Sequence, residues 1–567
     1  MMASLAPAAQ DLLRDPFGHD RFLPGQEAVI ARLLDGRNAL AIFPTGGGKS
    51  LCYQLPALVL PGLSVVVSPL LALMKDQVDS LRARGVLAAR LDSTLEPAQR
   101  GAVLGAIERG ELRLLYVAPE RFADERFRQL VLAARVSLFA VDEAHCISEW
   151  GHNFRPDYLK LARFGRECGA ERVLALTATA TPRVAGDICR GFGIEEADVV
   201  RTGFYRPNLF LLTSLVESET RDRLLLERLR RGEDGPTIVY VTLRRTAEAL
   251  AERLAGTGIA ARAYHAGIET SERERIQDWF MNEARAVIVA TIAFGMGSDR
   301  RDIRTFVHYN LPKSLVNYAQ EIGRAGRDGK PAVCELLASA ADVPVLRGFA
   351  ERSTASREAI NDLLDRVFAG PEEILVSEHE IALAHGTRPE VVRTLLVELE
   401  LAGHIVEGDP SAGLYRWRPA EPLASIVRRF RGEPARFLER LFAASRLART
   451  WYHLDADAAA RTLCEPRVRI DRAFAHLGEQ GLVELAPEGI ARRVRVLSRP
   501  ADADRLGLAL HSAALARRAR EFGRIEQMLR LVSAEGCRVA ALAAHFGETL
   551  PGPCGHCSGC VEEKESR

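Results

Sequence analysis

Two series of short apolar runs alternate with helical patterns between Asn38 and Leu337, and this alternation constrains the fold more than any other feature. The first series comprises the candidate strands Asn38–Phe43, Ser64–Ser68, Arg113–Val117, Ser137–Asp142 and Arg172–Thr177. The second comprises Thr237–Val241, Ala260–Tyr264, Ala286–Ala290, Thr305–Tyr309 and Ala332–Leu337. Strands that alternate with helices form parallel sheets covered by helices on both faces. The sequence therefore predicts two α/β lobes in tandem.

Size and charge limit what the rest of the chain can be. With 567 residues the chain is too long for one hydrophobic core, so roughly three or four domains are expected. The formal net charge of +1 restricts any nucleic-acid surface to a local concentration of arginine and lysine. The sequence has neither a secretory leader pattern nor an apolar run long enough to span a bilayer. We expect a cytoplasmic protein, nucleoid-associated if bacterial, with no membrane partner and reduced cysteines.

Beyond about Arg347 the pattern is mainly helical, and two stretches resemble each other. In each, a helical period ends at a glycine (Gly403 and Gly481, 78 residues apart), and a short apolar strand, a turn and a second strand are expected to follow. This order is typical of a winged-helix module. A small helical scaffold with a packing hairpin has the same pattern, so both interpretations stay open.

The region around these copies contains candidate aromatic and basic surfaces. In the first copy a turn is expected at Asp409–Gly413, followed by Tyr415 and Trp417. We expect these two side chains to pack the wing against its helix rather than to form a strand-separating wedge. Between the copies, Ser425–Tyr452 is predicted to be helical and holds seven arginines against two glutamates. A solvated helix face and a DNA-binding surface both explain that composition.

The segment IFPTGGGKS (Ile42–Ser50) leaves a predicted strand and enters a predicted helix. Glycines let backbone N–H groups approach phosphate oxygens, and the helix N-terminus adds a positive dipole end. Lys49 is predicted to reach the β- and γ-phosphates, and the Ser50 hydroxyl to bind Mg²⁺. Phe43 stands at the first glycine position of the P-loop pattern, so a glycine-rich turn without nucleotide is the alternative. The predicted nucleotide-binding residues of this loop are Thr45, Gly46, Gly47, Gly48, Lys49 and Ser50.

Two further strings carry the groups that hydrolysis requires. FAVDEAH (Phe139–His145) ends an apolar strand with two carboxylates. Asp142 is predicted to hold Mg²⁺, and Glu143 to orient or deprotonate the attacking water. In the second lobe, YAQEIGRAGRDG supplies Arg324 and Arg327, whose guanidinium groups suit the charge that develops on the γ-phosphate. A strand-end acidic turn and a solvated arginine pair are the alternatives for these strings.

Taken together, these strings resemble the RecQ family of superfamily 2 DNA helicases, from Phe17 to about Ala341 and again near the C-terminus. The resemblance implies an α/β fold of two tandem RecA-like parallel-sheet lobes. The residue pattern adds to these lobes a mainly helical region with two candidate winged-helix modules, followed by a C-terminal zinc-binding module. The resemblance also implies ATP hydrolysis with Mg²⁺, 3′-to-5′ movement on single-stranded DNA, and unwinding of duplex DNA in recombination, repair or replication.

The resemblance also implies roles for single residues. FGHDRFLPGQ (Phe17–Gln26) is similar to the adenine-contacting segment, with Gln26 as base reader and His19 in the aromatic position. Segments that resemble DNA-tracking or coupling elements are SPLLALMKDQ (with Ser68 and Pro69), YVAPERF, LTATAT (with Thr177) and YHAG (with His265). VATIAFGMGSD, with Gly297 and Asp299, falls where the second lobe of the family contacts nucleotide and DNA.

CISEWGHNFRPDY (Cys146–Tyr158) directly follows the DEAH string and resembles the family's aromatic-rich loop, which couples DNA to ATP hydrolysis. Trp150 and Phe154 offer faces for base stacking, and Arg155 adds a cation–π or phosphate contact. Aromatic core packing is the alternative.

The chain departs from the family pattern at several places: Leu23 replaces an arginine, Glu149 a glutamine, Asn153 an acidic residue, and Asp299-Arg300-Arg301 an Asn-Lys-Pro string.

Near the C-terminus, Cys537 precedes PCGHCSGC, which supplies Cys554, Cys557 and Cys560. Four thiolates at this spacing suit a structural, tetrahedral Zn²⁺, with His545 or His556 as alternative ligands. The zinc module follows the winged helices instead of the second lobe, an order that loosely resembles the Rothmund–Thomson-type branch. The expected domains are the first lobe (1–205), the second lobe (206–347), the helical linker with the first winged helix (348–420), the basic helix with the second winged helix (421–500), and the zinc module (501–567).

Other functions remain open at this stage. An RNA helicase, or a translocase that remodels without processive unwinding, would share the motor. A non-catalytic DNA-binding scaffold with a degenerate ATPase is a second rival. Expected partners are single-stranded and duplex DNA, together with single-strand-binding or recombination proteins that the sequence does not identify.

Overall fold

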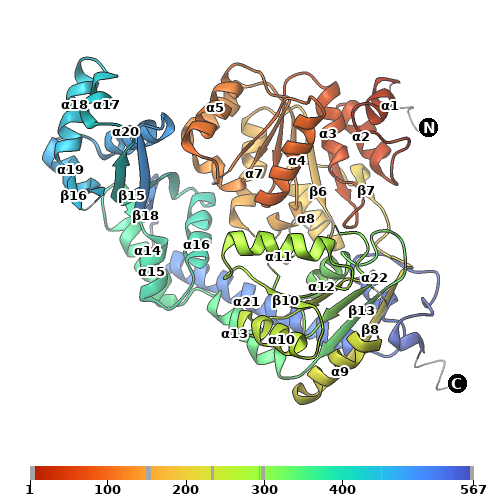
Figure 1. The fold of residues 1–567 in the computed structure, drawn as a ribbon. Coiled ribbons are helices and arrows are strands. Elements are labelled where there is room, and N and C mark those ends of the chain that lie inside the picture. Colours follow the sequence, from red (N-terminus) through yellow and green to blue (C-terminus); the bar gives the residue numbers. More distant parts are fainter. Residues whose placement is uncertain are drawn as a thin grey trace.

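The computed structural model describes residues 7–92, 94–148, 155–231, 235–292, 294, 300–448 and 450–561. Its first lobe contains one parallel seven-stranded sheet of order β3-β4-β2-β5-β6-β1-β7 (Figure 1). The strands are β1 (Ala39–Ile42), β2 (Leu63–Val67), β3 (Ala88–Leu91), β4 (Leu114–Val117), β5 (Val136–Val141), β6 (Val173–Thr177) and β7 (Val199–Arg201). The helices are α1 (Pro7–Arg14), α2 (Gln26–Leu34), α3 (Leu51–Val59), α4 (Leu71–Ala83), α5 (Pro97–Glu108), α6 (Glu125–Ala133), α7 (Pro156–Glu167) and α8 (Pro182–Phe192), with short 3-10 turns η1 (Pro119–Ala123), η2 (Ala144–Ile147) and η3 (Glu196–Asp198).

The central strands of this sheet are mostly apolar because both faces of the sheet are covered. In β2, Val65 and Val67 belong to one hydrophobic cluster and Val66 to another, on opposite sides of the sheet. Successive strand side chains point to opposite faces, so a strand buried on both sides has no polar alternation. This burial explains why the five predicted strands of this lobe were recognisable as continuous apolar runs.

The second lobe is a parallel six-stranded sheet of order β10-β11-β9-β12-β13-β8. Its strands are β8 (Leu209–Leu215), β9 (Thr237–Tyr240), β10 (Ala261–Tyr264), β11 (Val287–Ala290), β12 (Thr305–His308) and β13 (Ala332–Ala338). Its helices are α9 (Ser218–Arg231), α10 (Arg244–Gly256), α11 (Thr270–Asn282) and α12 (Leu315–Ile322). The prediction of two parallel-sheet lobes is confirmed, although β3, β7 and β8 were not predicted.

An accessory region follows, built on an antiparallel sheet of order β14-β18-β15-β17-β16. Its strands are β14 (Glu373–Val376), β15 (Ile405–Pro419), β16 (Arg446–Ala448), β17 (Trp451–Asp455) and β18 (Val483–Val496). Its helices are α13 (Asp342–Arg352), α14 (Arg357–Phe368), α15 (Glu378–Ala384), α16 (Pro389–Leu401), α17 (Leu423–Arg428), α18 (Glu433–Ala443), α19 (Ala456–Leu463) and α20 (Arg467–Glu479). Two helical winged-helix-like units therefore share one sheet.

Two details of this region differ from expectation. The turn predicted at Asp409–Gly413 is wrong, because β15 continues through it with only a register shift between Glu407 and Pro410. Instead of closing two local hairpins, β15 and β18 pair antiparallel with each other along most of their length. The stretch Ser425–Tyr452 is helical only at first and ends in strands β16 and β17.

The long β15–β18 ribbon buries opposite faces at its two ends. Near Ile405 and Val494 it packs on the first helical unit, and near Trp417 and Val483 on the second. Trp417 has no exposed surface and Tyr415 is buried. The expectation that both residues pack the wing against its helix is therefore confirmed.

Ion pairs fasten the accessory region to the first lobe. Lys160 on α7 contacts Glu407 with 2.8 Å between Nζ and Oε2, and it also pairs with Glu400. On α16, the Nε of Arg393 donates to Oδ2 of Asp157 at 3.1 Å. Figure 1 shows α17–α20 beside the first lobe, where α20 packs against α5.

The chain then returns to the motor. The helix α21 (Ala503–Ser533) runs from the accessory region to the second lobe, and α22 (Arg538–His545) lies against the end of that lobe (Figure 1). Among the described residues, no helix is both long and apolar enough to cross a membrane.

Candidate nucleotide site and zinc centre

The P-loop, residues 43–50, joins β1 to α3 at the carboxyl end of the first sheet. Gly46 and Gly48 have φ values of 84° and 69°, a backbone region that favours glycine. A Cβ atom at Gly48 would lie 2.4 Å from Nε2 of Gln26. The loop therefore requires glycine for close approach, as a backbone cradle for phosphate does.

Gln26 fixes this loop to the start of α2. Its side-chain Nε2 donates to the Gly48 carbonyl oxygen at 2.8 Å, and its Oε1 accepts from the Leu23 backbone N–H at 2.7 Å. The residue predicted to read adenine is thus buried and bonded to the P-loop itself, whereas His19 is exposed nearby in the chain. Lys49 donates from Nζ to the Phe43 carbonyl oxygen at 3.3 Å.

Asp142 lies at the end of β5, next to the loop. Its backbone N–H donates to the Val67 carbonyl oxygen at 2.8 Å, and Ser68 Oγ donates to its Oδ2 at 3.5 Å. Burial, together with the neighbouring charge of Glu143, raises the pKa of Asp142 to about 6, although Lys49 opposes the shift. A buried carboxylate of this kind fits a site where a divalent cation compensates the charge.

A chain of polar contacts leads from Glu143 back into the sheet. Glu143 has a left-handed φ of 49°, an uncommon conformation that places its carboxylate 3.2 Å from His145 Nδ1. The same nitrogen lies 3.0 Å from Thr177 Oγ1, which accepts from the Thr179 N–H at 3.2 Å. Burial opposes a charged His145, but Cys146 and Glu143 outweigh it and raise its pKa. The predicted coupling residue Thr177 is therefore connected to the DEAH string.

The second lobe presents its two candidate arginines differently. The Cδ atom of Arg327 would be 4.0 Å from a Cβ at Gly46, so this side chain lies across the cleft against the P-loop. Arg324 interacts with the hydroxyl of the buried Tyr240. Of the pair, Arg327 is the one placed beside the phosphate cradle.

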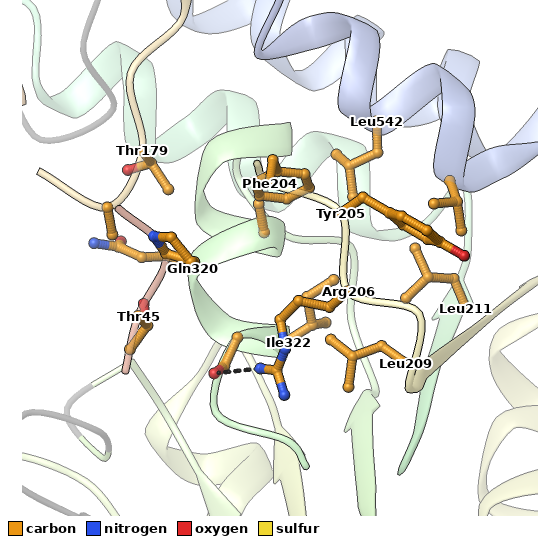
Figure 2. Close-up of a pocket in the computed structure, with 15 residues that line it drawn as sticks. Thr45, Thr179, Phe204, Tyr205, Arg206, Leu209, Leu211, Gln320, Ile322 and Leu542 are labelled. Carbon is orange, nitrogen blue, oxygen red and sulfur yellow. Dashed lines mark hydrogen bonds between the residues drawn. The ribbon is translucent and has the colours of Figure 1, made fainter. Parts of the chain in front are cut away.

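A pocket opens where the two lobes meet. It is lined from the first lobe by Thr45 and Thr179, from the second by Gln320 and Gly323, and by Leu542 of α22 (Figure 2). Phe204, Tyr205 and Arg206 of the linker between the lobes also line it. P-loop, coupling segment and arginine-bearing helix end thus converge on one inter-lobe space.

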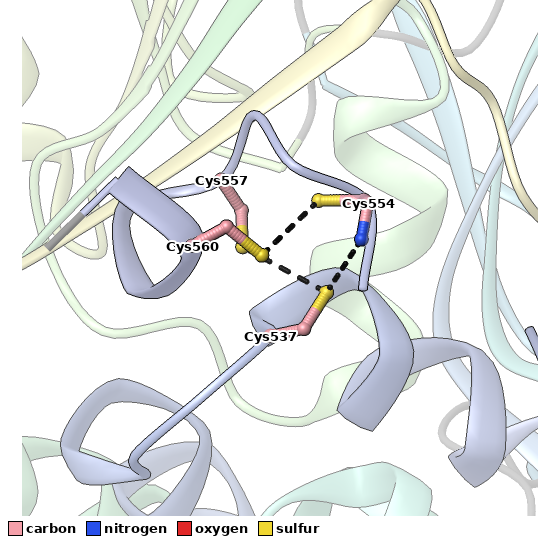
Figure 3. A group of neighbouring side chains, drawn as sticks. All are labelled: Cys537, Cys554, Cys557 and Cys560. Atoms are coloured by element: carbon pink, nitrogen blue, oxygen red, sulfur yellow. Dashed lines mark hydrogen bonds between the residues drawn. The ribbon is translucent and has the colours of Figure 1, made fainter. Parts of the chain in front are cut away.

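The four predicted zinc ligands come together at the start of α22 and the following loop (Figure 3). The sulfur atoms of Cys537, Cys554, Cys557 and Cys560 all lie within 4.8 Å of one another. The Cys554–Cys560 and Cys537–Cys557 sulfur pairs are each separated by 3.9 Å. Zn–S bonds of 2.3 Å in a tetrahedron require about 3.8 Å, so the cluster fits zinc.

Backbone groups prepare these sulfurs for a cation. The N–H groups of Ala540 and Cys554 each donate to Cys537 Sγ at 3.3 Å, and Arg538 N–H donates to Cys557 Sγ at 3.3 Å. Burial would raise the pKa of Cys557, but backbone N–H donors outweigh it and lower this pKa to about 7. His556 instead faces Tyr205, with 3.2 Å between Nε2 and the hydroxyl oxygen.

The zinc module also grips the inter-lobe linker. Phe546 stacks on Phe204 with 4.4 Å between ring centroids. Glu548 Oε2 accepts hydrogen bonds from the backbone N–H groups of Phe204 and Tyr205, the latter at 3.2 Å. This contact was not predicted, because nothing in the sequence relates a glutamate near the C-terminus to residues at the lobe junction.

The other predicted DNA-contact residues occupy varied places. Ser68 is buried against Asp142, and Pro69 follows it just beyond the carboxyl end of β2. His265 is buried, with Nε2 2.9 Å from Glu248 and Nδ1 accepting from the Gly267 N–H. Arg155 is exposed and immediately precedes α7. The predicted residues Trp150, Phe154, Gly297 and Asp299, and the departures Glu149 and Asn153, lie outside the described residues.

Comparison with protein families gives matches in both lobes and in the zinc module. Residues 23–188 match the DEAD/DEAH box helicase model, and residues 220–329 match the helicase conserved C-terminal domain. Residues 500–561 match the RecQ zinc-binding model, a range that includes all four clustered cysteines.

Similar proteins give the family. The "Probable ATP-dependent DNA helicase RecS" of Bacillus subtilis (strain 168) is 41% identical over 368 residues, covering 64% of this chain and 73% of that protein. The chain belongs to the RecQ family. The "ATP-dependent DNA helicase RecQ" of the same organism is 42% identical, over 63% of this RecQ-family chain and 60% of that protein. The "ATP-dependent DNA helicase RecQ" of Haemophilus influenzae is 43% identical over 59% of this chain and 54% of that protein. The chain therefore spans a little over half the length of these two RecQ proteins.

Family membership settles the cofactor predictions. The RecQ zinc-binding match and the thiolate geometry identify the cysteine cluster as the zinc site. ATP and Mg²⁺ are the cofactors expected of a DEAD/DEAH box motor. The parallel lobes, the winged-helix-like accessory sheet and the zinc module all agree with the predicted fold class.

Proposed function

We propose that this chain is an ATP-dependent DNA helicase that moves 3′ to 5′ on single-stranded DNA and unwinds duplexes in recombination, repair or replication. The observation that carries the proposal is the approach of Arg327, from the second lobe, to Gly46 in the P-loop of the first. A hydrolysis site divided between two lobes lets their closing and opening follow the nucleotide cycle.

In this proposal each residue has a defined task. The P-loop backbone with Thr45, Lys49 and Ser50 holds the phosphates, and Asp142 with Ser50 holds Mg²⁺, which supplies charge neutralisation of the phosphate oxygens. Glu143 orients the attacking water and accepts its proton.

Arg327, supported by Arg324, stabilises the charge that develops on the γ-phosphoryl group. The contacts from Glu143 through His145 to Thr177 give DNA binding a physical route to the carboxylates. Gln26 sets the position of the P-loop in addition to any contact with the base.

DNA, rather than RNA, is the proposed substrate because the similar proteins are named DNA helicases and the chain carries the RecQ zinc module. The test is ATP turnover with no nucleic acid, with single-stranded DNA and with single-stranded RNA. We expect strong stimulation by DNA, loss of turnover in Lys49→Ala, and a loss of about a hundredfold or more in Arg327→Ala.

The matched control is Arg253→Ala, which removes an exposed arginine paired with Asp222 on the second lobe. It should turn over ATP like the unmodified protein. Equal stimulation by RNA would make the chain an RNA-directed motor, and absence of turnover would make it a scaffold. Either result would overturn the proposal.

A further inference from the structure

One side of the accessory sheet gathers basic and aromatic side chains that the motor does not use. In the antiparallel pairing, Arg416 of β15 lies opposite His453 of β17, and Arg446 of β16 lies opposite the same histidine. The pairing of β15 with β17 ends at Trp417 and Tyr452, and the next residues, Arg418 and Trp451, are in contact across the two strands. Residues directly opposite each other project to the same side of a sheet. We call these five residues the arginine–tryptophan face.

This face points away from the hydrophobic core. The intervening residues Tyr415, Trp417 and Leu454 alternate to the other side, where they are buried against α18–α20. Arg418 and Arg446 are exposed, and Trp451 is partly exposed. The aromatic ring therefore lies on the surface of the sheet rather than within its core.

The arginines are organised around the tryptophan ring. The guanidinium carbons of Arg416 and Arg418 lie 5.0 Å and 5.3 Å from the centroid of Trp451. Arg418 also pairs with Glu484, the acidic residue opposite it on β18. Asp455, opposite Leu414, also projects to this side, so among the described side chains three arginines exceed two carboxylates, and the Trp451 ring adds a stacking surface.

The face continues from a part of the sheet that touches the predicted DNA track. The first half of β15 meets α7 through Glu407 and lies against η1, which belongs to the predicted DNA-tracking string YVAPERF. Arg416 is nine residues beyond Glu407 on the same strand, or about 30 Å at 3.3 Å per residue. A single DNA strand that leaves the first lobe and follows β15 would reach the arginine–tryptophan face.

We propose that the arginine–tryptophan face binds single-stranded DNA, with a base stacked at Trp451 and phosphates held by the arginines. The inference rests on the proposed function, because DNA reaches this face from the motor. Arginine with an exposed aromatic ring is the combination that proteins use for unpaired strands. Duplex DNA offers no free base face to Trp451, so the unpaired strand is the fitting ligand.

The test is fluorescence anisotropy of the full chain, without nucleotide, on labelled oligo-dT of about 30 nucleotides, longer than the roughly 4–16 that one stacking platform covers. Trp451→Ala should weaken binding about tenfold. Arg418→Gln with Arg446→Gln should lower the slope of log affinity against log salt by about 1.4, because each phosphate contact contributes about 0.7.

The matched control is Arg428→Gln with Arg436→Gln, which changes the charge equally on exposed arginines of α17 and α18 in the same unit. These substitutions should leave both affinity and slope unchanged. Since the Arg418 and Arg446 side chains lie outside the core, that pair keeps the test valid even where Trp451→Ala disturbs folding.

The outcomes test the arginine–tryptophan face and the proposed helicase function separately. Wild-type affinity and slope in both test variants, with DNA-stimulated turnover intact, would overturn the inference alone. Equal loss in the control pair would reduce it to a general charge effect and also overturn it. A larger loss of affinity in the test variants on oligo-rU than on oligo-dT would overturn the inference, because the face would then bind RNA. A wild-type protein with no DNA-stimulated turnover would refute the proposed function separately.

Discussion

Glu548 connects the zinc module to the linker between the lobes, and its removal should loosen that junction. Its Oε2 accepts the backbone N–H groups of both Phe204 and Tyr205. A Cβ at the neighbouring Gly203 would lie only 3.1 Å from Oε1 of Glu548, so the carboxylate and the linker backbone are in close contact. Glu548→Ala leaves these two N–H groups without their acceptor.

The size of the effect follows from the geometry. A hydrogen bond to a charged group contributes about 1.5–3 kcal/mol. Glu548 is half-buried, so water replaces part of what two such bonds supply, and the expected net loss is about 2 kcal/mol. Glu548→Gln can keep an oxygen at the same place without the charge, and it should cost about 1 kcal/mol.

Hydrogen exchange at the Phe204 and Tyr205 amides measures this loss locally. Exchange through opening of the junction should accelerate about 30-fold in Glu548→Ala and about fivefold in Glu548→Gln. Glu535→Ala, an exposed glutamate of the same module, should leave the rate unchanged. Equal protection in all three variants would refute the claim that Glu548 holds the linker.

Three further predictions concern metal, interface and pH. Cys557→Ser should lower zinc content in elemental analysis and reduce the melting temperature of the second lobe, because Cys557 packs in that lobe's core; a lobe that melts unchanged would contradict this. A double-mutant cycle of Asp157→Asn and Arg393→Gln should give a coupling of about 2 kcal/mol in denaturant unfolding, whereas additive losses would show that the pair does not anchor the accessory region. Burial raises the pKa of Glu407 above 4.5 despite Lys160. The folded state therefore binds the Glu407 carboxyl proton more tightly than the unfolded state does. Ionisation of Glu407 lowers the free energy of unfolding as the pH rises above about 4.5. Relative to Glu407→Gln, the unmodified protein should lose stability over that rise, and a constant difference between urea midpoints would contradict the assignment.

The motor could be predicted from sequence because its signals are local. Strands buried on both faces leave continuous apolar runs, and the candidate site residues follow them closely: Asp142 comes directly after β5, and Lys49 lies in the loop that leaves β1. The spacing of Cys554, Cys557 and Cys560 is equally local, since two-residue gaps bring sulfurs to tetrahedral distances. These features depend little on the rest of the fold.

The accessory region was harder because its pairing is not local. β15 and β18 are separated by four helices and two strands, and each was mistaken for a hairpin of its own. The arginine–tryptophan face forms only when β15, β16 and β17 pair, and the sequence of no single segment predicts that pairing. Its one local signal was the alternation of Arg416 and Arg418 around a buried Trp417. The prediction that Gln26 reads the base likewise missed its hydrogen bonds to Gly48 and Leu23.

The most direct test of the account is ATP-dependent strand separation on duplexes that carry a single-stranded tail at either the 3′ or the 5′ end. We expect unwinding of the 3′-tailed duplex only, and none with Lys49→Ala. DNA-stimulated hydrolysis without strand separation, or separation confined to the 5′-tailed duplex, would contradict the claim that this chain is a 3′-to-5′ DNA helicase.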